Sequence, residues 1–241
     1  MTHLVRAQLD ALVRSGNLWN RMVSPAQARA RAAAVLVLFA DEDTPAGPTG
    51  RVVTAGAAAS SAGAVLLEPH RLGDADAPSV DVLLIERAAS LNHHPGQIAF
   101  PGGRIDPGDS GPVAAALREG VEETGLDPAG VDVVGTLGDL PLPVSNHVVT
   151  PVLAWWHTPS AVSVMDPGES AAVFRVPVAT LLDPANRGSA IVRRGARVFD
   201  SPAFVVGERI VWGFTGLVLD GLFDALGWTQ PWEPRPIDVP L

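Results

Sequence analysis

Residues 100–126 read FPGGRIDPGDSGPVAAALREGVEETGL. The first part of this run, with Pro101 and the glycines that follow it, interrupts any regular element. Asp109 or Ser110 is placed to cap a helix, Pro112 suits a first helical turn, and Gly125 suits a helix end. The run therefore predicts a loop followed by a helix from Pro112 to Thr124.

The predicted helix has two unlike sides. At about 100° per residue, three glutamates lie within an arc of about 100°, and the other side is mostly apolar. The glutamates are Glu119, Glu122 and Glu123. A solvated acidic face is the simplest interpretation. However, like charges repel at this spacing, and carboxylates near a helix end oppose its dipole. Arg118 can hold Glu122 four residues away, and a divalent cation such as Mg²⁺ is the natural partner for the remaining carboxylates.

The same run resembles the Nudix box, G-x5-E-x7-R-E-U-x-E-E-x-G-U, in which U is an aliphatic residue. The matching positions are Gly103, Arg118, Glu119, Glu122, Glu123, Gly125 and Leu126. Asp109 stands where the first glutamate belongs and is followed by eight residues, instead of seven, before Arg118. Gly120 replaces the first aliphatic residue.

Two runs before the box resemble a narrower group. Residues 83–88, LLIERA, and 96–103, GQIAFPGG, are similar to the signature of coenzyme A diphosphatases within the Nudix superfamily, L-L-T-x-R-[SA] followed by G-x-x-x-F-P-G-G. In that subfamily the aspartate and the extra residue in the box are usual. Ile85 replaces the threonine, and Asn92 stands where an arginine is often found. Trp212-Gly213-x-Thr215 is also similar to the subfamily.

The resemblance implies an α/β Nudix fold, with a mixed β-sheet sandwiched between α-helices. The box helix would cover one face and the C-terminal helix the other. It also implies metal-dependent hydrolysis of a diphosphate bond in coenzyme A or acyl-CoA, giving 4′-phosphopantetheine and adenosine 3′,5′-bisphosphate. The alternative substrate is another nucleoside diphosphate derivative, such as ADP-ribose, NADH or a dNTP.

Site residues follow from the same resemblance. Mg²⁺ or Mn²⁺ would be held by Glu119, Glu122, Glu123 and the carbonyl of Gly103, with Arg118 orienting the glutamates. Substrate contacts would come from Arg87, Arg104, Gly102 and Gly103. In this family a glutamate in the region of Glu169 often serves as an added metal ligand or as the base. The choice of base between Glu119 and Glu169 stays open.

Composition excludes several other classes of protein. The chain contains no cysteine, which removes disulfides, thiolate nucleophiles and cysteine zinc sites. All 17 basic residues are arginines, so no lysine can form a Schiff base or serve a P-loop. The net charge of −9 argues against a nucleic-acid partner. No apolar run is long enough to span a membrane, and a cytoplasmic location is expected.

The rest of the chain predicts the domain organisation. Residues 1–30 form a helical extension, 31–228 the Nudix domain with an insertion at 44–79, and 229–241 a C-terminal tail. Strands are expected at 32–39, 80–86, 131–136, 148–157 and 172–176, a short helix at 179–182, and a hairpin flanked by Arg193, Arg194 and Arg197. Residues 210–228 predict the C-terminal helix. Nothing in the sequence opposes a homodimer.

Four alternatives stay open. The run Gly108-Asp109-Ser110-Gly111-Pro112 imitates the surroundings of a serine-protease nucleophile, but it leads into a helix and not into an all-β barrel. A non-catalytic Nudix-fold sensing module would normally carry a broken set of glutamates, whereas this set is intact. Trp155 and Trp156 are expected in the core, with stacking on a base as the alternative. His93 and His94 are expected to pack or to contact substrate.

Overall fold

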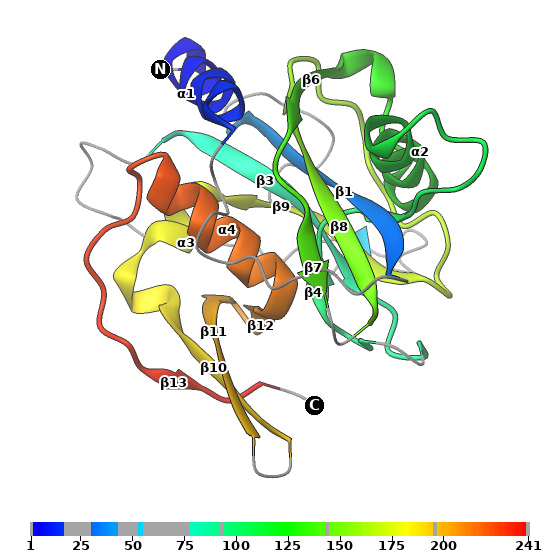
Figure 1. Ribbon diagram of the computed structural model, residues 1–241. Coiled ribbons are helices and arrows are strands. Elements are labelled where there is room, and N and C mark those ends of the chain that lie inside the picture. The colour runs from blue at the N-terminus through cyan, green and yellow to red at the C-terminus, as the bar shows by residue number, and fades with distance from the viewer. Residues whose placement is uncertain are drawn as a thin grey trace, which may run out of the picture.

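A computed structural model describes residues 2–16, 30–42, 53–54, 78–91, 94–142, 145–194 and 197–239. Figure 1 shows the helices and strands in these parts of the chain. The helices are α1 (Thr2–Ser15), α2 (Pro112–Thr124), α3 (Val178–Leu182) and α4 (Gly213–Ala225), with short 3-10 turns η1 (Pro128–Gly130) and η2 (Pro184–Asn186). The strands are β1 (Arg31–Asp41), β2 (Val53–Thr54), β3 (Val80–Arg87), β4 (Ile98–Ala99), β5 (Gly102–Arg104), β6 (Val131–Thr136), β7 (Leu140–Leu142), β8 (His147–Trp156), β9 (Ser170–Pro177), β10 (Arg187–Arg194), β11 (Arg197–Val206), β12 (Arg209–Val211) and β13 (Pro236–Ile237).

The larger sheet is mixed. Its strands run in the order β2-β9-β3-β1-β8-β6, while β4 pairs with β3, β5 with β1, and β7 with β8. The central pair, β1 and β8, is parallel, and β1 pairs antiparallel with β3 and with β5. One strand therefore fixes both the middle of the sheet and the short strand β5, which carries Gly102 and Gly103.

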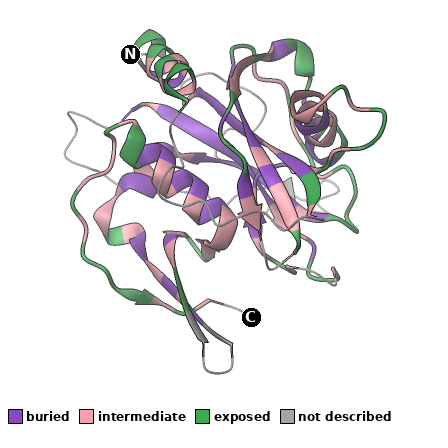
Figure 2. Cartoon of the chain, in the orientation of Figure 1, coloured by how far each residue is buried: buried purple, intermediate pink, exposed green. Residues whose placement is uncertain are grey.

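Both faces of β1 are buried, which explains its continuous apolar sequence. Ala34, Leu36 and Leu38 belong to the core beneath α2, whereas Val37 and Phe39 belong to the core shared with α1, α3 and α4. Figure 2 shows buried residues on the helices of both sides. The expectation of a mixed sheet between the box helix and the C-terminal helix is confirmed.

A second sheet lies beside α4 and has the strand order β12-β11-β10-β13. The hairpin of β10 and β11 was expected, and β12 and β13 extend it on its two sides. The C-terminal tail contributes β13, which pairs parallel with β10. None of the described helices is both long and apolar enough to cross a membrane.

Several boundaries differ from the sequence-based expectation. The C-terminal helix begins at Gly213, because Ile210 and Val211 pair with β11 as part of β12. The N-terminal helix ends at Ser15 within the described residues. The insertion at 44–79 lies almost wholly outside the described residues, apart from β2, which pairs with β9, and Pro78 and Ser79.

Candidate active site

Helix α2 runs from Pro112 to Thr124, as the sequence predicts. Gly125 ends it in the left-handed conformation (φ 68°), and its N–H donates to the carbonyl of Val121. Left-handed backbone suits glycine, which lacks a Cβ. The start differs from expectation: the N-cap is Gly111, without a side-chain capping bond, so neither Asp109 nor Ser110 caps the helix.

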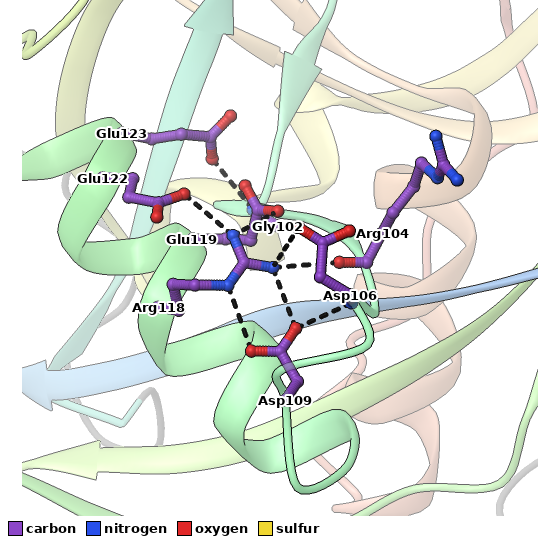
Figure 3. A network of polar contacts seen from close by, with 8 residues as sticks. All are labelled: Gly102, Arg104, Asp106, Asp109, Arg118, Glu119, Glu122 and Glu123. Atoms are coloured by element: carbon purple, nitrogen blue, oxygen red, sulfur yellow. Dashed lines mark hydrogen bonds and ion pairs between the residues drawn. The ribbon is translucent and has the colours of Figure 1, made fainter.

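Arg118 is the centre of a polar network beside α2 (Figure 3). Its Nε and Nη2 donate to the two carboxylate oxygens of Asp109 at 3.1 and 3.0 Å. Its Nη1 donates to Glu119 at 3.0 Å and to Glu122 at 2.8 Å. The fifth bond runs from Nη2 to the backbone carbonyl of Arg104 at 3.0 Å. A guanidinium has five N–H donors, so each donor of Arg118 has an acceptor.

The contact between Arg118 and Asp109 has the two-pronged geometry that is strongest for arginine and carboxylate. The Arg118 hydrogen bonds, followed by one from the backbone N–H of Asp106, lower the pKa of Asp109. In return, the hydrogen bonds to Asp109 raise the pKa of Arg118. Both groups are therefore charged over the whole physiological pH range. The box aspartate serves as the anchor of Arg118, a role that the sequence analysis did not assign to it.

Glu123 lies on the inner side of the helix. Its side chain is buried, with 7% of its surface exposed, and one carboxylate oxygen accepts the backbone N–H of Gly102 at 2.9 Å. Burial is the main cause that raises the pKa of Glu123 to about 8, while the Gly102 N–H and nearby Arg87 oppose the rise. A carboxyl group with this pKa exchanges protons near neutral pH.

Glu119 is half-buried and lies between Arg118 and Gly103 of β5. A Cβ added to Gly103 would stand 2.4 Å from a Glu119 carboxylate oxygen, so only glycine lets strand β5 approach the carboxylate this closely. Burial raises the pKa of Glu119, Arg118 lowers it, and Glu122 and Glu169 raise it further. The glycine of the box is thus needed for the position of the helix carboxylate.

Glu169 comes from a turn just before β9, as expected. Its charge raises the pKa of both Glu119 and Glu123, so the carboxylate belongs to the same electrostatic site. The turn is held by Asp166, whose Oδ1 accepts the Gly168 N–H at 2.7 Å. Arg87, at the end of β3, has the opposite effect and lowers the pKa of Glu123. Its Nε is buried and has no hydrogen-bond partner among the described residues.

The predicted residues thus lie in one region, but the three glutamates of α2 differ in their exposure to solvent. Glu122 is solvent-exposed and bound to Arg118, whereas Glu123 is buried against β5. The simplest interpretation, a solvated acidic face, does not hold for Glu123, because a helical wheel ignores how closely β5 approaches the helix. The Arg104 side chain points away from the network, and only its carbonyl joins it (Figure 3).

Two other expectations can be judged. Trp155 and Trp156 are 5% and 2% exposed, so they are core residues and stacking on a base is excluded. His93 lies outside the described residues.

Asp106, which the sequence analysis passed over, donates its N–H to Asp109 at 2.8 Å. The spacing of three residues between Asp106 and Asp109 was the sequence signal that could have indicated this turn.

The donor set suits a divalent cation in its chemistry. Among the described residues, no three His, Asp or Glu side chains are grouped tightly enough to bind a metal as they lie. Nevertheless, Glu119, Glu123 and Glu169 repel one another, and Glu119 and Glu123 are also partly stripped of water. A hard cation with oxygen ligands would relieve both costs. The residues present therefore fit Mg²⁺ or Mn²⁺.

The chain is similar to known proteins in sequence. The family model described as the NUDIX domain matches residues 59–194. An uncharacterized Nudix hydrolase, NudL, of Cronobacter sakazakii is 43% identical over 105 residues, which cover 44% of this chain and 54% of that protein. The chain thus matches about half the length of that relative. The NudL of Photorhabdus laumondii subsp. laumondii is 33% identical over 147 residues, covering 60% of this chain and 76% of that protein.

Two solved structures are also similar. A MutT/nudix family protein from Enterococcus faecalis has a TM-score of 0.45 and 15% identity, with 92% of this chain and 73% of that one covered. The NUDIX domain of Shewanella oneidensis NrtR, complexed with ADP ribose, has a TM-score of 0.39 and 18% identity, with 67% and 82% covered.

Proposed function

Since the chain belongs to the Nudix family, we propose that it hydrolyses a diphosphate bond in a nucleoside diphosphate derivative, with coenzyme A or an acyl-CoA as its substrate. The family assignment supports the class of reaction. The coenzyme A assignment rests on the two runs upstream of the box, residues 83–88 and 96–103. ADP-ribose, NADH and dNTPs are the alternative substrates.

One observation carries the proposal: Arg118 holds three carboxylates at once. Asp109, Glu119 and Glu122 all accept hydrogen bonds from the same guanidinium, so their positions are fixed before any substrate arrives. Carboxylates fixed in this way can bind a cation without rearrangement, and the cation would stabilise the negative charge of the transition state. A sensing module would not need this degree of ordering.

The proposed ligands of Mg²⁺ or Mn²⁺ are Glu119, Glu122, Glu123 and the Gly103 carbonyl, with Glu169 as a further candidate. Bound cations would neutralise the diphosphate and lower the pKa of a water molecule. Arg87 would contact a substrate phosphate, because its buried Nε lacks a partner among the described residues and suits an anion. Arg104, whose side chain leaves the network, would contact the outer part of the substrate.

The proton of the attacking water would pass to a carboxylate oxygen of Glu119 or Glu169. The pKa of Glu119 is raised by burial, which brings a carboxylate closer to the range in which a general base works well. Arg118 acts on this group as a positioning residue, since it holds Oε1 of Glu119 at 3.0 Å. We place the catalytic domain at residues 31–228.

Product analysis tests the proposal. Purified protein with Mg²⁺ is incubated with coenzyme A, ADP-ribose, NADH and a set of dNTPs, and the products are identified by mass spectrometry. We expect 4′-phosphopantetheine and adenosine 3′,5′-bisphosphate from coenzyme A. Glu122→Gln should lower turnover by roughly 100-fold or more, because the change removes a carboxylate ligand of the proposed cation, which would stabilise the charge of the transition state.

The matched control is Glu233→Gln, an exposed glutamate on the C-terminal tail, which should leave turnover unchanged. Equal thermal unfolding of both variants would show that the domain is intact. Hydrolysis of ADP-ribose in preference to coenzyme A would contradict the substrate assignment. Near-normal turnover of Glu122→Gln would contradict the assignment of the site.

A further inference from the structure

Residues 163–170 connect the end of α2 to the start of β9. The Ser163 N–H donates to the carbonyl of Thr124, the last residue of α2, at 2.9 Å. The Met165 sulfur lies 2.8 Å from the point where a Cβ on Gly125 would stand, so the segment also covers the end of the helix. Its last residue opens β9, which pairs with β3. The segment therefore joins the helix of the box glutamates to the central sheet.

Glu169 lies near the end of this segment, and core packing does not fix its position, because residues 165–169 are all exposed. The position of Glu169 therefore depends on the hydrogen bonds of the backbone around it. On one side, the Glu169 carbonyl accepts the N–H of Ala88, just after β3, at 2.9 Å. The charge of Glu169 raises the pKa of Glu119 and of Glu123, so the turn presents its carboxylate to both.

Asp166 supplies three hydrogen bonds on the other side of Glu169. Its Oδ1 accepts the Gly168 N–H at 2.7 Å, and its backbone carbonyl accepts the N–H groups of Glu169 at 3.1 Å and of Ser170 at 3.0 Å. A side-chain oxygen that accepts the N–H two residues ahead forms an Asx turn, and Pro167 supplies the fixed φ that suits the second position of a turn. Asp166 thus accepts three successive N–H groups, and Glu169 carries the middle one.

Two other turns in the described residues have the same bonding pattern. Asp127 Oδ1 accepts the N–H of Ala129 at 2.9 Å, and Asp183 Oδ1 accepts the N–H of Ala185 at 2.8 Å, each across a proline. These two turns open η1 and η2, and neither carries a residue of the candidate active site. A comparison of Asp166 with Asp183 therefore separates the loss of a turn from the loss of an active-site position.

We infer that Asp166 is a positioning residue for the reaction, because it fixes the turn that presents Glu169 to Glu119 and Glu123. The inference rests on the proposed function, in which Glu169 is a candidate for the base and for a metal ligand. Either role requires the carboxylate at one place, and a misplacement of about 1 Å can cost about 100-fold in rate. Asp166 acts through Glu169, so its replacement should alter turnover more than substrate binding.

Steady-state kinetics of Asp166→Ala and Asp166→Asn on the best substrate of the panel test the inference. Alanine removes the oxygen that accepts the Gly168 N–H, whereas asparagine keeps one. We expect Asp166→Ala to lower kcat by roughly 10- to 100-fold with KM changed by less than about threefold, and Asp166→Asn to retain at least about half of kcat. In a Glu169→Gln background, the alanine change should lower kcat by less than about twofold, because the group that Asp166 positions is already gone.

Hydrogen exchange followed by NMR gives a second measurement, which does not depend on turnover. The amides of Gly168, Glu169 and Ser170 should exchange at least about fivefold faster in Asp166→Ala than in the natural chain. The matched control is Asp183→Ala, which removes the equivalent bond in another turn and should leave both kcat and these three amides unchanged. Equal thermal unfolding of the two alanine variants would show that the domain is intact in both.

The inference is overturned if Asp166→Ala keeps more than half of the natural kcat, if its loss is undiminished in the Glu169→Gln background, or if Asp183→Ala loses as much. Since the natural chain hydrolyses its substrate in each of these cases, the proposed function would stand. Absence of hydrolysis by the natural chain would instead refute the proposed function, and the exchange rates alone would then decide whether Asp166 fixes the turn.

Discussion

Arg118 makes five hydrogen bonds, and the replacement of its guanidinium tests how much of the site depends on them. Lysine carries the same charge but has a single nitrogen, so Arg118→Lys cannot hold Asp109, Glu119 and Glu122 together. We expect kcat/KM to fall by roughly 100-fold, because displaced catalytic groups typically cost this much. Steady-state kinetics on the best substrate measures the change.

The control is Arg6→Lys, which alters an arginine of α1 that donates to Asp132 of β6 at 2.9 Å and takes no part in the Arg118 network. Its kinetics should match those of the natural chain. If Arg118→Lys retained at least half of the original kcat/KM, the ordering role of the guanidinium would be refuted.

Asp81 and Arg175 form a buried ion pair between β3 and β9, with Nε and Oδ1 2.7 Å apart. Burial raises the pKa of Asp81 from 3.8 to about 7, although Arg175 acts in the opposite direction. The folded state therefore binds more protons than the unfolded state between these values. The contribution of Asp81 to the free energy of unfolding is fully present below pH 3.8 and is lost as the pH rises through about 7.

Urea unfolding at several pH values between 5 and 8 tests this dependence. The natural chain should lose more stability across this range than Asp81→Asn, which has no proton to release at this position. Asp139→Asn, at an exposed aspartate, should follow the natural chain. Parallel stability curves for the natural chain and Asp81→Asn would show that the carboxyl does not titrate in this range.

At the scale of elements, the contact of α2 with the sheet explains one departure from the Nudix box. Gly120 stands where the box has an aliphatic residue. A Cβ at this position would lie 2.9 Å from Leu36 of β1 and 3.1 Å from Leu126, so the helix packs closely at this point. The two leucines occupy the space that an aliphatic side chain of the box would fill.

Gly120→Val should therefore destabilise the fold by roughly 1–3 kcal/mol, the usual cost of adding methyl groups to a packed core. Denaturant unfolding monitored by tryptophan fluorescence measures the difference. Gly108→Ala is the control, because nothing lies within 4 Å of a Cβ added there. A stability of Gly120→Val equal to that of the natural chain would mean that the helix can shift away from β1 at little cost.

Most long elements could be predicted from the sequence, because they have strong boundaries. Helix α2 lies between a proline and a left-handed glycine, and β1 is a continuous apolar run. Short strands such as β4, β5 and β7 could not be predicted, since two or three residues carry no repeating pattern and only their pairing with β3, β1 and β8 defines them. Residues 210–212 are as apolar as the helix that follows, so the sequence gives no local sign that β12 ends and α4 begins there.

Site residues were predictable by type and less so by environment. The motif spacing predicted that Arg118 and the glutamates act together, and the region of the chain suggested Glu169; the structure brings these residues into one candidate site. The burial of Glu123 was not predictable, because it results from β5 approaching the helix. The anchoring role of Asp109 was not predictable either, because Asp109 lies in the loop before α2 and comes close to Arg118, nine residues later, only in the folded chain.

At the scale of the whole molecule, α1 packs on the main domain and shares its core. Leu9 is fully buried, Gln8 accepts a hydrogen bond from the Trp228 indole at 3.2 Å, and Val13 covers Gly135 of β6. The first and last helical regions of the chain therefore meet beside one sheet (Figure 1).

Leu9→Ala should lower the free energy of unfolding by about 2–5 kcal/mol, as large-to-small changes in a core do. Leu4→Ala, on the same helix with 65% of its residue surface exposed, should have little effect. Calorimetry of both variants measures the difference, which should appear within a single unfolding transition. Equal melting temperatures for the two variants would show that α1 adds nothing to the stability of the domain.

The parallel pairing of β1 with β8 has a further consequence for biosynthesis. Residues 31–40 are aligned with residues 147–156, and β3 is aligned with β9, at residues 170–177. A ribosome has therefore translated well over half of the chain before β1 acquires its parallel neighbour. Until then the apolar strand β1 lacks its partner β8, and contacts between residues this distant in sequence form slowly. During synthesis β1 can therefore pair with β3 and β5, while its pairing with β8 has to follow the emergence of Trp156 from the exit tunnel.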